Sequence, residues 1–322
     1  MITPSRRPSI PTRLLDGRIC AYDLSPDLRG VLAPTAEFRP LPDDEVKSHT
    51  VFADLQRAVY TTLNSVVCAA ADGTELWRSD LRPLSDRLHG HWPGCALSLD
   101  EREVWVYRPD AMAGRNGPDR WVVLDARTGA TVAGVDLETV GHGGQQYRNA
   151  SDGHILLDVG EGQDGSVIYR AALDGAEVRL TRYPWPDRCL IDLAPDGRQF
   201  MTVDHGQADV AFHNYPAGDT TLVLTADAFG HEAEDAYIEW SGGYLTPDSA
   251  LITIACEIDP EDDEDLDDDE REGHRHYHLD LLTREITEFP VTSHNSYDLT
   301  PLGDGTWLTS APSGHPVRWP AH

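Results

Sequence analysis

Lysine is almost absent from this sequence: Lys47 is the only one, and every other basic residue is an arginine. The 26 Lys and Arg residues stand against 55 Asp and Glu, which gives a net charge of −29. Proteins that bind polyanions neutralise phosphates with Lys and Arg, so this balance argues against nucleic acid and membrane surfaces as partners. Another protein, above all a basic one, remains a compatible partner through electrostatic attraction.

Long hydrophobic runs are missing as well. No stretch approaches the roughly 20 apolar residues that a membrane-spanning helix needs. Arg6-Arg7 is followed by Pro8-Ser9-Ile10-Pro11 and not by the apolar segment of an export signal, so we expect a cytoplasmic protein.

The five cysteines include no C-x-x-C pair, which excludes a zinc ribbon and a thioredoxin-type motif. We expect free thiols that pack as small apolar residues in a reducing compartment. The chain also lacks a G-x-S-x-G elbow, a phosphate-binding loop and the Rossmann glycine fingerprint. The cysteines are Cys20, Cys68, Cys95, Cys189 and Cys256.

What the sequence does contain is a repeat. A turn-forming aspartate recurs at intervals of about 50 residues, each time ahead of a short apolar run. A second series of turns lies half a period later, so each unit holds four short strand-like runs without an amphipathic helix. This pattern predicts an all-β fold. The aspartates of the first series are Asp54, Asp100, Asp152, Asp196, Asp248 and Asp304.

A third series, in phase with the other two, places Gly-His or Ser-His before a unit, as in Gly141-His142 and Gly230-His231. With closing pairs such as Leu124-Asp125, the chain resembles the WD-repeat family of β-propellers, although it contains no Trp-Asp pair. The resemblance implies a ring of small antiparallel sheets that leaves few exposed edges. In that family the inter-blade histidine binds a turn aspartate, for which Asp119, Asp164 and Asp209 are the candidates here.

We expect residues 1–322 to form one propeller domain of six four-stranded blades, with seven as the alternative because Pro316–Trp319 supplies a further strand. The isolated amino-terminal strands Ile19–Asp23 and Gly30–Ala33 are expected to close the ring by joining the last unit. The resemblance places inter-blade loops and the loops between second and third strands on one face. Two insertions are of this kind, Arg108–Asp119 and the acidic, flexible loop Asp259–Gly273.

The acidic insertion holds eleven Asp and Glu residues between 259 and 272. A run of like charge stays solvated, so the simplest role is solubility, and the functional alternative is attraction of a basic partner. A calcium loop is disfavoured because the Asp-x-Asp-x-Asp-Gly spacing is absent. The binding candidates within it are Asp262, Asp263, Glu264, Asp265, Asp267, Asp268 and Asp269.

Histidines supply the metal and ligand hypotheses. His274, His276 and His278 alternate on one predicted strand, a spacing that suits a transition-metal pair but also packing positions or a pH-sensitive contact. The other histidines are candidates for structural pairing or for a polar lining of the central channel that holds a small ligand. They are His49, His91, His142, His205, His231 and His294.

These observations favour a protein-binding platform with an acidic interaction face. Trp92, Trp185 and Trp240 are its expected aromatic anchors. The alternative is a propeller enzyme or small-ligand binder that uses channel-facing His and Asp residues. We predict no cofactor, and a divalent metal belongs only to that alternative.

Overall fold

The computed structural model describes residues 10–24, 29–86, 92–185, 187–232, 236–257, 272–291 and 293–320. Within these ranges the chain consists of β-strands and two short 3-10 helices, so the predicted all-β class is confirmed. The described residues divide into two compact units. Unit one contains those up to 185 except 29–31, and unit two contains 29–31 together with those from 187 onward.

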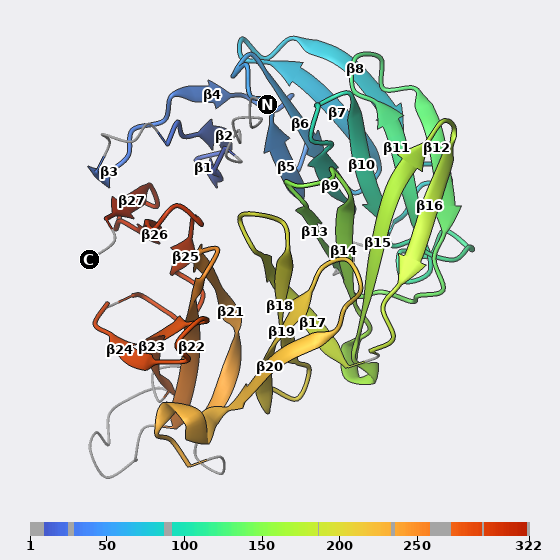
Figure 1. The fold of residues 1–322 in the computed structure, drawn as a ribbon. Helices are drawn as coiled ribbons and strands as arrows, with labels where there is room; N and C mark the ends of the chain where they lie inside the picture. The colour runs from blue at the N-terminus through green and yellow to red at the C-terminus, as the bar shows by residue number, and fades with distance from the viewer. Residues whose placement is uncertain are drawn as a thin grey trace, which may run out of the picture. The chain divides into compact units, whose positions relative to one another are not determined.

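Unit one contains one three-stranded sheet and three sheets of four strands, all antiparallel (Figure 1). Each four-stranded sheet is a meander of consecutive strands. The strands are β1 (Thr12–Leu15), β2 (Arg18–Ala21) and β4 (Ala36–Phe38); β5 (Ser48–Val51), β6 (Arg57–Thr61), β7 (Ser65–Ala70) and β8 (Glu75–Asp80); β9 (Gly94–Leu97), β10 (Glu103–Arg108), β11 (Arg120–Asp125) and β12 (Thr131–Asp136); β13 (Gly144–Arg148), β14 (Ile155–Gly160), β15 (Ser166–Asp174) and β16 (Glu177–Arg182), with the 3-10 helix η1 (Gly162–Asp164) before β15.

Unit two contains three four-stranded antiparallel sheets. Its strands are β17 (Arg188–Leu193), β18 (Gln199–Asp204), β19 (Asp209–Asn214) and β20 (Thr220–Thr225); β21 (Ala236–Thr246), β22 (Ser249–Glu257), β23 (Glu272–Asp280) and β24 (Ile286–Phe289), preceded by the 3-10 helix η2 (Ala226–Phe229); and β25 (Thr300–Pro301), β26 (Trp307–Ser310), β27 (Pro316–Trp319) and β3 (Gly30–Val31).

The fold is a β-propeller, and its described strands form seven blades. Six blades were favoured from the sequence, and the alternative of seven is the correct one. The difference lies near the amino terminus, where β1, β2 and β4 build a sheet of their own. The expected meeting of N- and C-terminal strands in one blade is confirmed for Gly30-Val31, since β3 pairs with β27 and places Val31 opposite Val317. It was wrong for Ile19–Asp23, because β2 pairs with β1 and β4 and not with the C-terminal strands.

The turns follow the aspartate series found in the sequence. Asp196 Oδ1 accepts a hydrogen bond of 2.9 Å from the backbone N–H of Arg198, and Asp54, Asp100, Asp152 and Asp304 bind the residue two positions on in the same way. Such a bond replaces a missing strand-pairing partner and fixes the reversal of the chain. In the second series, backbone N–H groups hold the pKa of Asp72 and Asp280 below the usual value.

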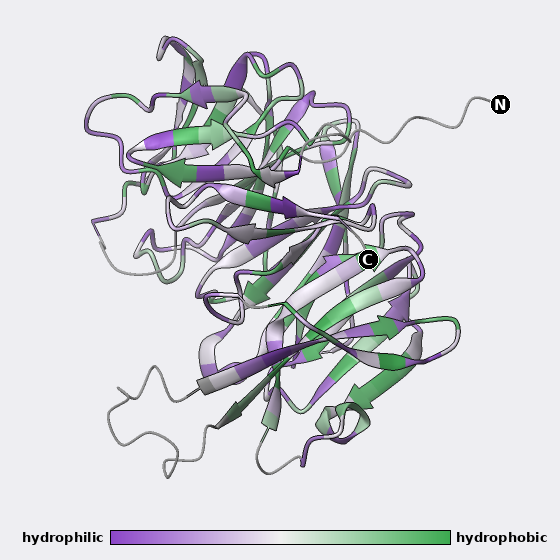
Figure 2. Ribbon diagram, turned by 90° about the vertical axis from the view of Figure 1, so that its left-hand side faces the viewer, coloured by the Kyte–Doolittle hydropathy of each residue, from purple (hydrophilic) through white to green (hydrophobic). Residues whose placement is uncertain are grey.

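The core lies between neighbouring sheets of each unit. In unit one, for example, Val59, Cys68, Val104 and Val122 are buried between the sheets β5–β8 and β9–β12. Figure 2 shows the hydrophobic residues concentrated on the strands, while many connecting segments are hydrophilic. Burial on both faces favours apolar, β-branched second and third strands. The first strands lie beside one another, β1 to β13 in unit one and β17, β21 and β25 in unit two.

The meander topology also fixes where candidate functional residues gather. Because the strands alternate in direction, the loop between the second and third strands leaves a sheet from the same end as the segment that enters its first strand. Insertion 108–119 connects β10 with β11, and the acidic insertion connects β22 with β23, as expected. We call this end of each sheet its loop end.

Candidate functional site

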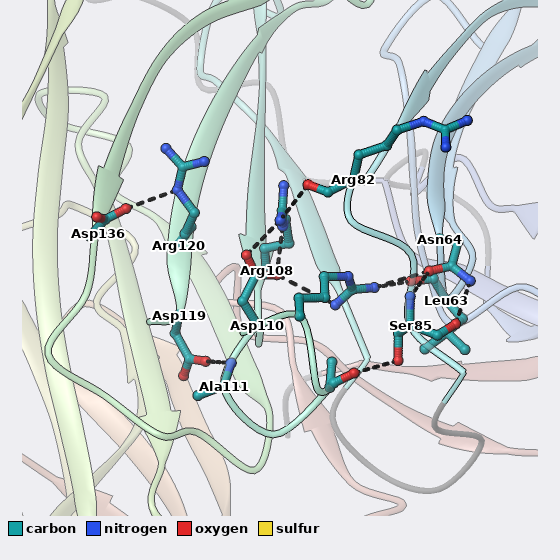
Figure 3. A network of polar contacts seen from close by, with 12 residues as sticks. Leu63, Asn64, Arg82, Ser85, Arg108, Asp110, Ala111, Asp119, Arg120 and Asp136 are labelled. Carbon is teal, nitrogen blue, oxygen red and sulfur yellow. Dashed lines mark hydrogen bonds and ion pairs between the residues drawn. The ribbon is translucent and has the colours of Figure 1, made fainter. Parts of the chain in front are cut away.

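Insertion 108–119 holds a network of buried charges (Figure 3). Asp110 accepts hydrogen bonds from Arg108 Nε at 2.6 Å and Arg108 Nη2 at 2.5 Å. Arg115 Nη1 lies 3.5 Å from the same carboxylate, and Arg115 Nη2 donates to Leu63 O at 2.5 Å. The side chains of Arg108, Asp110 and Arg115 are at most 8% exposed, so these charges pair with one another inside the protein and do not face solvent.

Asp119, at the end of the insertion, is fully buried and accepts four hydrogen bonds. Two come from hydroxyls, Tyr107 and Thr139, each at 3.0 Å. Two come from backbone N–H groups, Ala111 at 3.1 Å and Gly141 at 2.6 Å. Asp119 thus binds the backbone of the Gly-His pair and not a histidine ring, and it joins the insertion to the segment that enters β13.

Gly141 leaves no room for a side chain. A Cβ there would overlap with Tyr107 Oη and Val159 Cγ1. We expect Gly141→Ala to lower the free energy of unfolding by about 1–3 kcal/mol, because overpacking forces its neighbours apart. Denaturant unfolding measures the loss. Gly160→Ala is the control, because nothing lies within 4 Å of a Cβ there; equal effects of the two changes would contradict the packing argument.

The inter-blade histidines lie in different surroundings. His49 lies on β5, and its buried Nε2 has no hydrogen-bond partner among the described residues. Burial lowers the pKa of His49. The His142 ring lies against Gly162 of η1, and His294 is exposed after β24. His91 lies outside the described residues. The structure therefore shows no shared chemistry for His49, His142 and His294.

Two of the three expected aromatic anchors belong to unit one. Trp92 is 42% exposed, and one face of its ring covers Lys47, whose Nζ lies 4.2 Å from the ring centroid. Trp185 is half-buried and stacks on Tyr183 at 5.3 Å with nearly parallel rings. One face of each ring is thus in contact with a neighbouring side chain of the same chain.

Two of the three histidines on β23 are held by hydroxyl groups. His274 Nε2 and His276 Nε2 both lie 2.8 Å from Ser293 Oγ. His276 is buried, and its Nδ1 lies 3.0 Å from Thr253 Oγ1. Burial lowers the pKa of His276 to about 4. This hydrogen bonding favours the packing role that the sequence left open for His276.

No group of three or more His, Cys, Asp and Glu side chains suited to a metal ion occurs in the part of the chain that the structure describes. The acidic candidates Asp262, Asp263, Glu264, Asp265, Asp267, Asp268 and Asp269 lie outside that part, so their role stays a prediction. The strands on either side are described, and β22 and β23 pair residue by residue from Ser249–Asp280 to Glu257–Glu272.

The first strand of this sheet carries an irregular segment. The pairing of β21 with β22 jumps from Ile238–Ile254 to Gly242–Ile252, so Glu239, Trp240 and Ser241 form a bulge opposite one residue. Gly242 and Gly243 follow with φ of 107° and 145°, values that favour glycine. Bulges of this kind redirect side chains and are frequent beside functional sites.

The bulge buries a carboxylate with little compensation. Glu239 is 5% exposed, and among the described residues its one hydrogen bond comes from Gln207 Nε2 at 3.5 Å. Ser241 is 8% exposed, and its buried Oγ has no hydrogen-bond partner in the part of the chain that the structure describes. A buried carboxylate normally requires strong partners, because removing it from water costs several kcal/mol. The Glu239 carboxylate can therefore accept a further hydrogen bond.

Trp240 lies between these groups in sequence and is 38% exposed. Its Nε1 donates to Asp204 O at 3.2 Å, and the His205 ring lies 5.8 Å from its own. Asp204, His205 and Gln207 belong to the β18–β19 turn, which closes with a 2.8 Å bond from Gln207 N to Asp204 O. One short turn therefore contacts both Glu239 and Trp240. We call the bulge residues Glu239, Trp240 and Ser241, together with Asp204, His205 and Gln207 of the turn, the bulge site.

Sequence reasoning singled out Trp240 and His205 but missed Glu239, Ser241 and Gln207. The available signal was Gly242-Gly243 directly after Glu239-Trp240-Ser241, since paired glycines within a strand pattern indicate a bulge.

No family model matches the chain, and no curated protein matches it. Solved structures do. The Dos1 propeller is 9% identical with a TM-score of 0.56, and the match covers 98% of this chain and 82% of that one. Hydrazine synthase of Kuenenia stuttgartiensis is 13% identical, with a TM-score of 0.52 over 87% and 90% of the two chains. BBS1N, solved in complex with ARL6DN, is 12% identical, with a TM-score of 0.52 over 98% and 91%.

Likeness at this level of identity shows the fold alone, a β-propeller. The similar proteins include an enzyme and a protein solved with a partner, so the fold is compatible with either kind of function. In the described residues, no helix has the length and apolar character needed to cross a membrane.

Proposed function

We propose that this chain is a protein-binding platform of the WD-repeat type that recognises a basic partner. The observation that carries the proposal is the bulge site, where a buried, weakly compensated carboxylate and an exposed indole stand side by side in the chain. An arginine or lysine side chain from a partner satisfies both groups at once.

The chemistry of the two residues suits such a cation. A guanidinium or ammonium group is attracted to the face of a Trp ring, and the attraction grows when water is removed. Its N–H groups supply the donors that Glu239 lacks, and charge-assisted hydrogen bonds are roughly twice as strong as neutral ones. Tryptophan is also enriched among the residues that dominate binding energy at protein interfaces.

The acidic insertion adds long-range attraction to this local fit. It belongs to the sheet that carries the bulge, and it begins and ends at the loop end, between β22 and β23. The net charge of −29 has the same sign. Clustered charge of one sign accelerates encounter with an oppositely charged partner and makes binding depend on salt. We therefore assign the insertion to attraction and the bulge site to anchoring.

The test uses a fluorescent arginine-rich peptide as the probe and fluorescence anisotropy as the readout. Trp240→Ala is expected to raise the Kd roughly 10-fold, which corresponds to the 1–2 kcal/mol of a partly desolvated cation–π contact. Glu239→Gln should act in the same direction. Replacing the Asp residues of the insertion by Asn should lower the association rate and flatten the salt dependence.

Trp319→Ala provides the matched control. Trp319 is 43% exposed on β27, in a different sheet, and donates to Thr309 Oγ1 at 2.8 Å. Its removal should leave the Kd unchanged. Equal losses from Trp240→Ala and Trp319→Ala would contradict an anchoring role for the bulge site and leave only nonspecific attraction between charges.

A further inference from the structure

A cysteine and a tyrosine of the sheet β21–β24 form a chain of contacts with a histidine from the segment between η2 and β21. Cys256 Sγ, near the end of β22, lies 3.5 Å from His231 Nδ1. His231 Nε2 lies 2.6 Å from Tyr277 Oη on β23, and the two rings meet edge to face at 5.7 Å. A nucleophile, a base within hydrogen-bonding distance and a third group that orients the base is the arrangement found around activated thiols.

Cys256 differs from the other cysteines. Cys20, Cys68 and Cys95 are buried, and burial raises the pKa of Cys68 to about 11 and that of Cys95 to about 12. These thiols are inert at neutral pH, because the thiolate is the nucleophile. Cys256 is partly exposed and lies beside a base. Cys189 is partly exposed too and provides a comparison within the same chain.

His231 is suited to take the proton of this thiol. Burial, and then the charge of Arg275, lowers its pKa, so its imidazole is neutral at pH 7. Burial raises the pKa of Tyr277, which keeps that phenol uncharged. With the Nε2 proton donated to Tyr277 Oη, the lone pair of Nδ1 faces Cys256 Sγ. Tyr277 is thus a positioning residue for the base.

The location of the pair suggests the charge of its reactant. Cys256 directly precedes Glu257, where β22 ends and the acidic insertion begins. In sequence, eleven acidic residues follow Glu257, and the opposing charges are Arg271 and Arg275, of which Arg275 acts on His231. We therefore expect the pair to react more readily with neutral or cationic reagents than with anionic ones.

We propose that Cys256 is a nucleophilic thiol, activated by His231, that exchanges with neutral or cationic low-molecular-weight disulfides. The thiol proton passes to His231 Nδ1, and Cys256 Sγ attacks one sulfur of the disulfide. A new S–S bond forms to that sulfur, the old S–S bond breaks, and the departing thiolate takes the proton from His231. The reactant disulfide is the oxidant, and the product is a mixed disulfide at the base of the acidic insertion.

The proposal is independent of the partner-binding function and has its own test. The full chain is mixed with neutral 4,4′-dithiodipyridine, and thiopyridone release is followed by absorbance. One thiol is expected to react at least about 10-fold faster than Cys189, and Cys256→Ser should remove this phase. His231→Gln should slow it at least about 10-fold, and Tyr277→Phe should shift its pH profile. Cys189→Ser is the control that leaves the fast phase intact.

Two further measurements make the result independent of whether the variants fold. Brief alkylation of the unmodified protein with iodoacetamide, followed by peptide mapping, ranks Cys256 against Cys189 directly. Cystamine and glutathione disulfide, compared by intact mass, test the preference for positive charge. Equal labelling of Cys256 and Cys189, or a fast phase that survives in folded His231→Gln, would overturn the proposal; a preference for glutathione disulfide would overturn its charge specificity.

Discussion

Asp110→Ala is expected to lower the free energy of unfolding by about 3–5 kcal/mol, since removing one partner leaves buried charge without compensation. Asp110 is the only carboxylate that the structure shows bound to Arg108 and Arg115, whose side chains are 8% and 0% exposed. Burial already lowers the pKa of Arg115, and the described residues offer its Nε no hydrogen-bond partner. The variant therefore leaves two guanidinium groups in the interior without their anion.

Arg120→Ala is the matched control for this experiment. Arg120 directly follows insertion 108–119, and its Nε forms an ion pair of 2.9 Å with Asp136 Oδ1 (Figure 3). Both side chains are exposed, at 42% and 63%. Exposed pairs contribute about 0–1 kcal/mol. Denaturant unfolding of both variants, with limited proteolysis of insertion 108–119, measures the difference. Similar losses would show that the buried network does not hold the insertion in place.

Acidification from pH 6.5 to 4 is expected to destabilise the protein through two buried histidines. Burial lowers the pKa of His213 and of His276 from 6.5 to about 4. In this interval the unfolded chain binds a proton at each histidine and the folded chain does not, so stability falls as the pH falls. The limiting slope is about 1.4 kcal/mol per pH unit for each histidine.

The surroundings of the two rings explain the direction. Thr202 Oγ1 accepts from Arg188 Nε at 2.6 Å and lies 2.8 Å from His213 Nε2. When Thr202 is the donor of this contact, it occupies the lone pair that a second proton on the ring would need. The Arg188 charge opposes protonation, and Asp209 favours it to a smaller extent. His276 faces His274, which opposes its protonation, and Asp298, which favours it. Turn aspartates with a lowered pKa, such as Asp125, lose most of their contribution as the pH falls through 3.8 and below, so the histidines dominate the upper part of this interval.

The measurement is the free energy of unfolding as a function of pH between 6.5 and 4.5. The double variant His213→Gln/His276→Gln should show a flatter dependence than the unmodified protein, even if it is less stable throughout. His294→Gln, which changes an exposed histidine, should leave the slope unchanged. An unchanged slope in the double variant would assign the acid sensitivity to other groups.

Most of the fold could be predicted because its information is local. Five of the six turn aspartates bind a neighbouring backbone N–H, and the second and third strands are apolar runs, so both are visible in a short window of sequence. The number of blades was harder to predict. β4 is only Ala36–Phe38 and β1 only Thr12–Leu15, and such short strands have no pattern of their own until a neighbouring sheet covers them.

The candidate site was predicted less completely, for a physical reason. Trp240 and His205 could be predicted because aromatic and histidine residues near loops often take part in binding. Glu239 was not, because its burial arises from a bulge in β21 and from Gln207 of another sheet. Cys256 lies near the end of β22 and His231 lies before β21, 25 residues earlier, so no spacing within one element indicates their contact.

The pairing of Val31 with Val317 has a consequence for biosynthesis. A ribosome delivers β3 long before β27, so the sheet that contains both stays incomplete until β27 has been made. Bringing such remote segments together requires closing a very long loop, which slows folding. Until β3 pairs with β27, each of the two strands has an unpaired edge, and a nascent chain with an open strand edge is a substrate for chaperones and for aggregation.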